Sequence, residues 1–239
     1  MHLVVTGGAG FIGSNFTSLA LAKGASVTVL DALTYASGRQ FIEADKKLYP
    51  NRCKLVADSI LNRETVYDLV READAVVHFA AESHNDNSLR DPLLFMRTNV
   101  DGTAMLLEAA REFDVRFHHV STDEVYGDLP LNTHQKFTEE SPYRPSSPYS
   151  ASKAAADHLV RAWVRSFGLQ ATISNSSNNF GPRQHVEKLI PRTITERLLG
   201  RLPRVYGTGQ NVRDWVHVDD HNEAVWQILQ HGQVGRTYL

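Results

Sequence analysis

Short, mainly apolar runs alternate with longer segments of helical periodicity along most of the chain. Such runs are typical of strands that are buried on both faces of a parallel sheet. They lie at residues 3–5, 27–30, 55–57, 75–79, 117–120 and 170–174. Between them, apolar residues recur at helical spacing, most clearly over residues 95–113 and 148–167. The alternation predicts an α/β fold built on a doubly wound parallel sheet.

This rhythm changes twice toward the C-terminus. Residues 127–147 are rich in Pro, Ser and Thr, which predicts a connecting loop. From residue 175 onward Gly, Pro, Asn and Arg are frequent and the elements are short. We therefore expect a sheet domain over residues 1–174 and a smaller lobe over residues 175–239. A helix at residues 218–230 is a candidate to pack back on the first domain, with Asp219 or Asp220 as its cap.

Composition narrows the class of protein. Hydrophobic residues make up 42% of 239, and 25 basic against 27 acidic residues give a formal net charge of −2. This balance excludes a disordered chain and gives no support to nucleic-acid binding through bulk positive charge. No apolar stretch approaches the length of a membrane span, and the N-terminus lacks the pattern of a signal peptide. A single cysteine, Cys53, fits a reducing compartment, so we expect a cytoplasmic protein.

A glycine-rich turn joins the first predicted strand to the first predicted helix. It reads Gly-Gly-Ala-Gly-Phe-Ile-Gly over residues 7–13. Glycines here let the backbone approach a pyrophosphate, whose charge meets the positive end of the helix. Asp31 ends the second strand, where a carboxylate can hold ribose hydroxyls and would repel a 2′-phosphate. The combination predicts a Rossmann-type domain that binds NAD rather than NADP; the alternative is a structural turn with Asp31 as a helix cap.

Two further strand ends face the same predicted crevice. Asp58 ends the third strand, and Ala80 and Ala81 end the fourth. The carboxyl ends of parallel strands in such sheets line the ligand crevice, so we expect these residues near the cofactor. The alternative for each is a loop residue with no ligand.

Tyr149 and Lys153 are four residues apart and therefore share one face of a predicted helix. A tyrosine of ordinary pKa is a poor base at neutral pH. A neighbouring lysine, together with a positive nicotinamide, would favour the phenolate and let Tyr149 accept a hydroxyl proton during hydride transfer. The same spacing is common on helix surfaces, but behind a dinucleotide-binding pattern it indicates redox chemistry.

An acidic pair stands at the end of the fifth predicted strand. Asp123 and Glu124 follow Thr122 in the segment Ser-Thr-Asp-Glu-Val-Tyr-Gly, residues 121–127. Simple hydride transfer needs a tyrosine and a hydroxyl but no pair of carboxylates. The pair therefore suggests a second chemical step with one acid and one base; the alternative is a helix cap or a solvated pair.

With these motifs in view, the sequence resembles the dTDP-glucose 4,6-dehydratases, which are extended short-chain dehydrogenases/reductases. The matching segments follow in order over essentially the whole chain. They are residues 6–13, 80–84 (Ala-Ala-Glu-Ser-His), 121–127, 148–153 (Pro-Tyr-Ser-Ala-Ser-Lys), 177–182 (Ser-Asn-Asn-Phe-Gly-Pro), 187–191 (Glu-Lys-Leu-Ile-Pro) and 213–215 (Arg-Asp-Trp). The Thr-Asp-Glu triplet is the most discriminating segment, because sugar-nucleotide epimerases of similar fold lack the acid pair.

The resemblance implies a lyase that converts dTDP-glucose to dTDP-4-keto-6-deoxyglucose. It implies that Tyr149 takes the proton of the C4 hydroxyl as hydride passes from C4 to NAD, with Thr122 bonded to that oxygen and Lys153 tuning the phenol. Glu124 then removes the C5 proton, Asp123 protonates the departing C6 hydroxyl, and the hydride returns to C6. NAD is regenerated and should stay bound.

The resemblance also implies binding residues and an assembly. Cofactor contacts are expected from Gly7, Gly10, Phe11, Ile12, Gly13, Asp31, Thr34, Asp58, Ser59, Ala80, Ala81, Asn99, Tyr149 and Lys153. Substrate contacts are expected from Ser83, Asn178, Lys188 and Arg213, within a partial nucleotide-sugar lobe that lacks a C-terminal part. A homodimer is expected through the helices at residues 94–113 and 148–167. Residues 84–88 read His-Asn-Asp-Asn-Ser where the family more often has His-Val-Asp-Arg-Ser.

Other functions remain open at this point. The nearest is a nucleotide-sugar 4-epimerase or decarboxylase of the same fold, against which Asp123 and Glu124 weigh. A truncated NAD-binding protein without turnover and an interaction protein are the others. We expect no metal site, since His118 and His119 would point to opposite faces of a strand.

Overall fold

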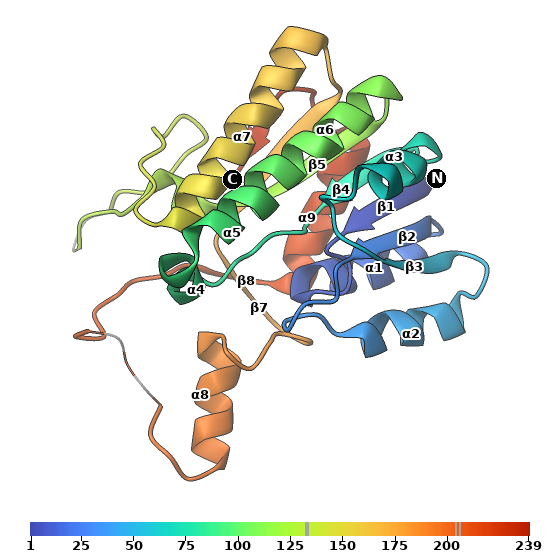
Figure 1. The fold of residues 1–239 in the computed structure, drawn as a ribbon. Helices are drawn as coiled ribbons and strands as arrows, with labels where there is room; N and C mark the ends of the chain where they lie inside the picture. The colour runs from blue at the N-terminus through green and yellow to red at the C-terminus, as the bar shows by residue number, and fades with distance from the viewer. Residues whose placement is uncertain (132–133, 204, 206) are drawn as a thin grey trace.

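The computed structural model describes residues 1–131, 134–203, 205 and 207–239, and its centre is a seven-stranded parallel sheet (Figure 1). The strand order is β3-β2-β1-β4-β5-β6-β9. The strands are β1 (His2–Thr6), β2 (Ser26–Asp31), β3 (Cys53–Ala57), β4 (Ala75–His78), β5 (Arg116–Thr122), β6 (Ala171–Ser176) and β9 (Thr237–Tyr238). The order steps outward from β1 in both directions, which confirms the predicted doubly wound, Rossmann-type sheet.

Helices cover both faces of this sheet because both faces of its strands are apolar. On one face Val5 and Val29 pack with side chains of α1 (Phe11–Ala22), α2 (Arg39–Leu48) and α9 (Val218–His231). On the other face Val4 and Phe117 pack with α3 (Arg63–Arg71), α6 (Gly102–Glu112) and α7 (Pro148–Phe167). In Figure 1, α6 and α7 run side by side along this second face.

The helix predicted over residues 148–167 forms with these bounds as α7. Pro148 occupies its first turn, and Ser147 and Ser150 form a reciprocal capping box at its start. Gly168 ends it in the left-handed conformation, with φ 73°. The capping signals at both ends explain why sequence periodicity located this helix well.

The helix predicted over residues 95–113 is interrupted. It consists of α5 (Pro92–Met96), a π-helical turn (Arg97–Asp101) and α6, preceded by the short helix α4 (Asn85–Arg90). The π-helical turn carries Asn99, which is buried. Such turns are frequent at functional sites.

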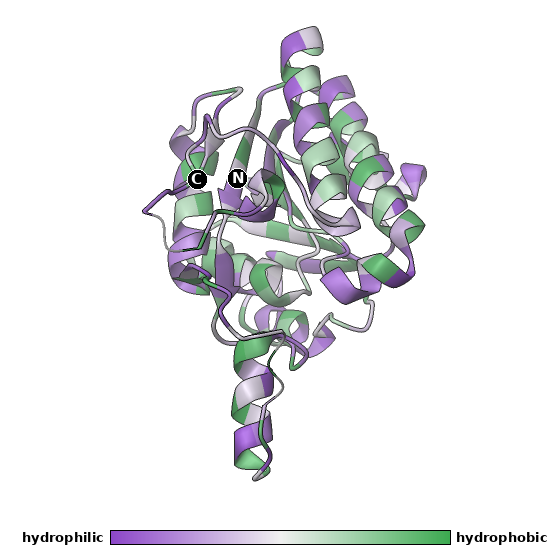
Figure 2. Cartoon of the chain, turned by 90° about the vertical axis from the view of Figure 1, so that its left-hand side faces the viewer, coloured by the Kyte–Doolittle hydropathy of each residue, from purple (hydrophilic) through white to green (hydrophobic). Residues whose placement is uncertain are grey.

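The chain after residue 175 divides between a small lobe and the main body. β7 (Asn178–Phe180) and β8 (Trp215–His217) pair in a separate two-stranded parallel sheet. α8 (Leu189–Leu198) projects away from the body in both views (Figures 1 and 2), and its ten residues are all at least partly exposed. α9 packs against α1, and β9 pairs with β6 in the main sheet.

The expectation that Asp219 or Asp220 caps α9 is wrong. His217 occupies the N-cap position, and its Nδ1 accepts a hydrogen bond from the backbone N–H of Asp219 at 3.3 Å. A histidine ring in the extended N-cap conformation thus takes the place of a carboxylate.

Within the described ranges, no helix is long and apolar enough to cross a membrane.

Candidate active site

The glycine-rich turn packs closely against the residue that follows β4. Gly7 has φ +67°, and a Cβ atom there would lie 2.5 Å from the backbone nitrogen of Ala80. A Cβ atom on Gly13 would overlap the carbonyl oxygen of Gly7. Larger residues at either position would push the turn away from the start of α1 or from the end of β4.

The start of α1 suits an anion. Gly10 is its N-cap and, as a glycine, has no side chain to accept from the first N–H groups of the helix. Those groups carry the positive end of the helix dipole. Together with the close packing of the turn, this geometry fits a pyrophosphate, so the residues present fit the dinucleotide that the sequence predicts.

Asp31 ties this turn to the loop after β2. Its Oδ2 accepts from the backbone N–H of Ala9 at 2.9 Å, and its Oδ1 accepts from Leu33 N–H and Ser37 Oγ, each at 2.8 Å. The side chain is buried, with 6% of its surface exposed. The predicted ribose-binding carboxylate therefore lies at the glycine-rich turn and is held there by three donors.

Asp58 and Asn99 bind mainly other parts of the protein. Asp58 accepts hydrogen bonds from Ser59 N–H and from the side chains of Asn62 and Thr65, and these bonds, with Thr65 the strongest, lower the pKa of Asp58. Asn99 is 1% exposed. Its amide accepts from the Glu82 N–H at 2.9 Å and donates to the Glu82 carbonyl at 3.0 Å and to Ser152 Oγ at 2.8 Å.

The three hydrogen bonds of Asn99 connect the loop after β4 with α7. The other predicted cofactor residues lie at the turn and strand ends as expected from topology. Thr34 is exposed in the loop after β2, and Ser59, Ala80 and Ala81 are half-buried. Their contacts to a cofactor stay predictions.

The acidic pair lies in a single 3₁₀ turn, Asp123–Tyr126, directly after β5. Thr122 caps this turn, and its hydroxyl accepts from the Glu124 N–H at 3.3 Å. Burial, and then the charge of Glu124, raise the pKa of Asp123 to about 6, against smaller opposing effects of Thr122 and Arg213. Asp123 can therefore carry a proton close to neutral pH, as a general acid requires.

Glu124 has a partner that the sequence analysis did not connect with it. Its Oε2 accepts a hydrogen bond from Asn85 Nδ2 at 3.0 Å. Asn85 is the first residue of α4 and belongs to the segment that departs from the common family pattern. A residue that differs from the common family pattern, Asn85, therefore contacts the predicted base, Glu124, directly.

Tyr149 lies at the start of α7, with its ring edge-on to Phe95 at 6.3 Å between centroids. Burial, and then the charge of Glu124, raise the pKa of Tyr149, whereas a hydrogen bond from Thr122 acts in the opposite direction. The expectation of a phenol with a lowered pKa is thus not met by the protein alone. The reason is that carboxylates and apolar surroundings, both unfavourable to a phenolate, dominate around this hydroxyl.

Lys153 is buried one helical turn after Tyr149. Its Nζ donates to the Val120 carbonyl at 2.9 Å and lies 3.3 Å from Nε2 of His119. Burial lowers the pKa of Lys153 to about 8, although the charge of Asp157 raises it. Lys153 therefore carries its positive charge at neutral pH within a buried site.

The predicted substrate residues lie after β4, in β7 and in the segments that precede α8 and β8. Lys188 Nζ donates to the Ser83 carbonyl at 3.2 Å, and burial lowers the pKa of Lys188. Arg213 is exposed but near enough to Asp123 to lower the pKa of that carboxyl. Asn178 is half-buried in β7. The structure thus brings Lys188 to Ser83 and Arg213 to the acidic pair, while contacts to a substrate stay predictions.

His118 and His119 point to opposite faces of β5, as the sequence predicts. His118 bonds to the side chains of Thr172 and Ser174 on β6, whereas His119 faces Lys153 and Asp157, so the two rings lie on opposite faces of β5. Among the residues that the structure describes, no group of three or more His, Cys, Asp or Glu side chains could hold a metal ion.

The sequence motifs did not point to Asp157, although it continues the four-residue spacing of Tyr149 and Lys153 along α7.

The chain is similar to known proteins over essentially its whole length. Residues 4–239 match the model of a family described as GDP-mannose 4,6 dehydratase. A dTDP-glucose 4,6-dehydratase of Mycolicibacterium smegmatis is 62% identical over 241 residues, which cover 100% of this chain and 72% of that protein. The crystal structure of DesIV, a dTDP-glucose 4,6-dehydratase from Streptomyces venezuelae with NAD bound, superposes with a TM-score of 0.95 at 44% identity, covering 100% of this chain and 74% of that one.

The fold extends to enzymes of another activity. The UDP-glucose 4-epimerase of Thermus thermophilus, in complex with NAD, superposes with a TM-score of 0.85 at 33% identity, covering 100% of this chain and 76% of that one. Fold alone therefore does not separate dehydration from epimerisation, and the distinction depends on the side chains of the site.

Proposed function

The chain belongs to the family described as GDP-mannose 4,6 dehydratase, and we propose that it is a hydro-lyase that uses NAD to convert dTDP-glucose to dTDP-4-keto-6-deoxyglucose. The observation that carries this proposal is the pair Asp123 and Glu124 beside Tyr149, with the pKa of Asp123 raised to about 6. Oxidation at a hydroxyl needs NAD as hydride acceptor and Tyr149 as base, with the hydroxyl of Thr122 beside it, whereas loss of water needs a further acid and a further base.

The first domain supplies the cofactor site. The N–H groups at the start of α1 would receive the pyrophosphate, and Asp31 would receive the adenosine ribose. When bound there, NAD supplies the hydride acceptor and, in its oxidised form, a positive charge beside Tyr149. The protein's part is to place the substrate's C4 hydroxyl within reach of Tyr149 and Thr122.

Tyr149 acts as the base toward that hydroxyl. It must first lose its own proton, which is opposed by burial and by Glu124 and favoured by the hydrogen bond from Thr122. The ammonium of Lys153, one helical turn away, adds positive charge on the same helix face. The hydroxyl proton then passes to Tyr149 as C4 becomes a ketone.

The acidic pair performs the elimination. The new ketone acidifies the C5 proton, which Glu124 removes, while Asp123 gives its proton to the C6 hydroxyl that leaves as water. After hydride reaches C6, Glu124 returns its proton to C5. The proton held by Tyr149 replaces, through solvent, the one that Asp123 lost, so the site is restored.

The predicted substrate residues are suited to a nucleotide diphosphate. Arg213 and Lys188 are cationic, and Asn178 and the Ser83 segment offer further polar groups. We assign the diphosphate contacts to Arg213 and Asn178, with Lys188 and Ser83 lining the same pocket. The division into an NAD-binding domain, residues 1–174, and a nucleotide-sugar domain, residues 175–239, belongs to the same proposal, with α9 packing back on the first domain and β9 joining its sheet.

We also infer a cytoplasmic homodimer without a nucleic-acid or membrane partner. Its interface would involve α5, α6 and α7, where Leu93 and Phe167 expose 66% and 54% of their surface. The nearly equal numbers of basic and acidic residues support neither binding to nucleic acid nor binding to an anionic membrane through bulk positive charge.

Incubation of the protein with dTDP-glucose, followed by mass spectrometry, tests the proposed function. The expected product is lighter than the substrate by one water. A product of unchanged mass identified as dTDP-galactose would instead establish an epimerase. UDP-glucose and GDP-mannose, used in parallel, report on the nucleotide preference, and a protein that binds NAD and dTDP-glucose without any product would overturn the proposal.

A further inference from the structure

Four polar side chains follow one another at four-residue spacing along α7. They are Tyr149, Lys153, Asp157 and Arg161. The proposed chemistry uses the first two. Asp157 has no exposed surface, and a carboxylate is kept in such a position only when donors and opposite charge compensate its burial.

Asp157 and Lys153 both approach the same ring nitrogen of His119. His119 Nε2 lies 3.3 Å from Asp157 Oδ1 and also 3.3 Å from Lys153 Nζ. The ring itself is neutral, because burial and the charge of Lys153 lower the pKa of His119 to about 4. The positive lysine and the negative aspartate are therefore separated by one uncharged imidazole edge.

The second carboxylate oxygen of Asp157 accepts hydrogen bonds from two side chains, one of which also contacts the segment that carries the acidic pair. Its Oδ2 accepts from Tyr143 Oη at 2.7 Å and from Asn175 Nδ2 at 3.0 Å. The same Asn175 amide donates to the backbone carbonyl of Thr122 at 3.1 Å. Asp157 is thus joined through one side chain to the residue that begins the catalytic turn.

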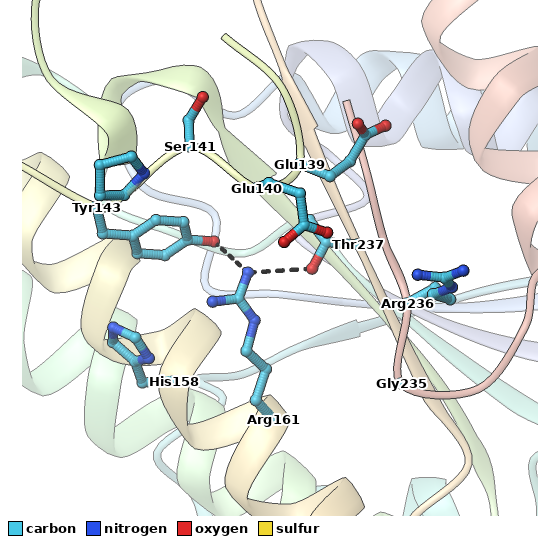
Figure 3. Close-up of a pocket in the computed structure, with 10 residues that line it drawn as sticks. Glu139, Glu140, Ser141, Tyr143, His158, Arg161, Gly235, Arg236 and Thr237 are labelled. Carbon is cyan, nitrogen blue, oxygen red and sulfur yellow. Dashed lines mark hydrogen bonds between the residues drawn. The ribbon is translucent and has the colours of Figure 1, made fainter.

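The network continues outward to a cavity of about 550 Å³ (Figure 3). There Arg161 Nη2 donates to Tyr143 Oη at 2.8 Å and to Thr237 Oγ1 at 3.1 Å. Arg161 therefore supports Tyr143 from the solvent side and ties β9 to the same network.

The balance of charge around Lys153 gives Asp157 its importance. Burial lowers the pKa of Lys153, and Asp157 is the charge that raises it. The Val120 carbonyl is a neutral acceptor. The other titratable groups facing this pair are His78 from β4, His119 from β5, Tyr149 and Arg161 from α7, Tyr126 from the 3₁₀ turn and Tyr143 from the following loop.

We propose that Asp157 is a positioning residue that keeps Lys153 charged beneath Tyr149 and, through Asn175, fixes the end of β5. The inference rests on the proposed function only where it gives Lys153 a role beside Tyr149. Asp157 itself acts through Lys153 and Thr122. Without the charge of Asp157, the buried ammonium of Lys153 would contact only neutral groups, the Val120 carbonyl and the His119 ring. Its pKa would then fall toward or below neutral pH.

The proton on Lys153 can be followed directly by NMR of protein labelled with ¹³C-lysine. The Cε signal is assigned by its loss in Lys153→Met, and its shift is titrated against pH. In Asp157→Asn the midpoint should fall by one pH unit or more, since an opposite charge within ~4–6 Å is worth roughly one to three units. A fall of about two units would leave roughly one tenth of Lys153 charged at pH 7.

Two variants control for structural damage. Tyr143→Phe removes a hydrogen bond to the same carboxylate but keeps its charge, so the Lys153 midpoint should stay in place. Asp157→Glu keeps the charge with a longer side chain and should restore a midpoint above that of Asp157→Asn. An equal fall in Asp157→Asn and Tyr143→Phe, or no fall in Asp157→Asn, overturns the proposal.

If Asp157→Asn does not fold, the unmodified protein still gives an answer, because a Lys153 midpoint below pH 7 would also overturn the proposal. Kinetics provide a second criterion. The rate of NADH formation in Asp157→Asn should fall most at high pH and recover as the pH is lowered, whereas purely structural damage would reduce it equally at every pH. The NMR midpoint needs no substrate, so a failure of the dehydratase assay and a failure of this inference are distinguishable.

Discussion

Replacing Asp123 by Asn should stabilise the folded protein at pH 7.5 while abolishing dehydration. The wild-type carboxyl is partly desolvated and lies beside Glu124, so its pKa rises from an ordinary 3.8 to about 6. An ionised group in such a place destabilises the fold. Asparagine keeps the shape of the side chain, removes the charge and cannot donate an acidic proton.

The size of the effect follows from the pKa shift. A shift of about two units corresponds to roughly 3 kcal/mol at 1.36 kcal/mol per unit, and partial exposure of Asp123 reduces this to about 2 kcal/mol. Because its folded-state pKa is raised, the native protein binds more protons than the unfolded chain between about pH 4 and 6. Its stability therefore falls as pH rises through this window, and the penalty is complete above it.

Urea unfolding at two pH values measures this dependence. Asp123→Asn should gain about 2 kcal/mol in the free energy of unfolding at pH 7.5 and roughly half as much at pH 5. Asp128→Asn, at an exposed position in the same segment, should show no such pH-dependent gain. The NAD content of all samples must be matched, since a bound ligand adds to stability. A loss of stability at pH 7.5, or an equal gain at both pH values, would refute the reasoning.

Two further substitutions test separate parts of the site. Glu124→Gln should stop product formation yet allow the absorbance of NADH to appear at the first oxidation, and normal product formation would remove Glu124 as the C5 base. Asp31→Ala should weaken NAD binding about tenfold to a hundredfold in a calorimetric titration, by loss of charge-assisted hydrogen bonds. Ser37→Ala, which keeps the carboxylate, is the control, and unchanged NAD affinity in Asp31→Ala would take Asp31 out of the site.

Strands of the main sheet were predictable where their burial left a continuous apolar run. Residues 235–239 resemble a strand of the family, but their place in the main sheet was not predictable, because the two residues of β9, Thr237 and Tyr238, have no periodicity and are defined by pairing with the edge of β6. The π-helical turn at Arg97–Asp101 was not predicted for a related reason. One extra residue in a turn scarcely alters an apolar pattern, and the turn is defined by backbone hydrogen bonds that the sequence does not show.

Site residues were predictable where a motif fixed both spacing and context. Tyr149 and Lys153 were identified in this way, and the spacing of Asp157 offered the same signal without a motif. Its partners could not be inferred, because His119 and Asn175 reach it from other strands. The sequence did not predict the direction of the Tyr149 pKa shift for the same reason. The nearby carboxylates follow the end of β5, and only folding brings them close to the phenol.

The proposed division of roles between Asp123 as acid and Glu124 as base is a property of their surroundings. The two side chains are chemically similar and adjacent in sequence, yet the 3₁₀ turn gives them different partners. Asp123 is desolvated, with a pKa of about 6, whereas Glu124 accepts a hydrogen bond from Asn85 across the crevice. A carboxyl that holds its proton near neutral pH is suited to protonate a leaving hydroxyl, and a hydrogen-bonded carboxylate is suited to take a carbon-bound proton. The proposed order of acid and base follows from these different partners, and the exchanged variant with Asp123→Glu and Glu124→Asp should form no product from dTDP-glucose in the mass-spectrometric assay.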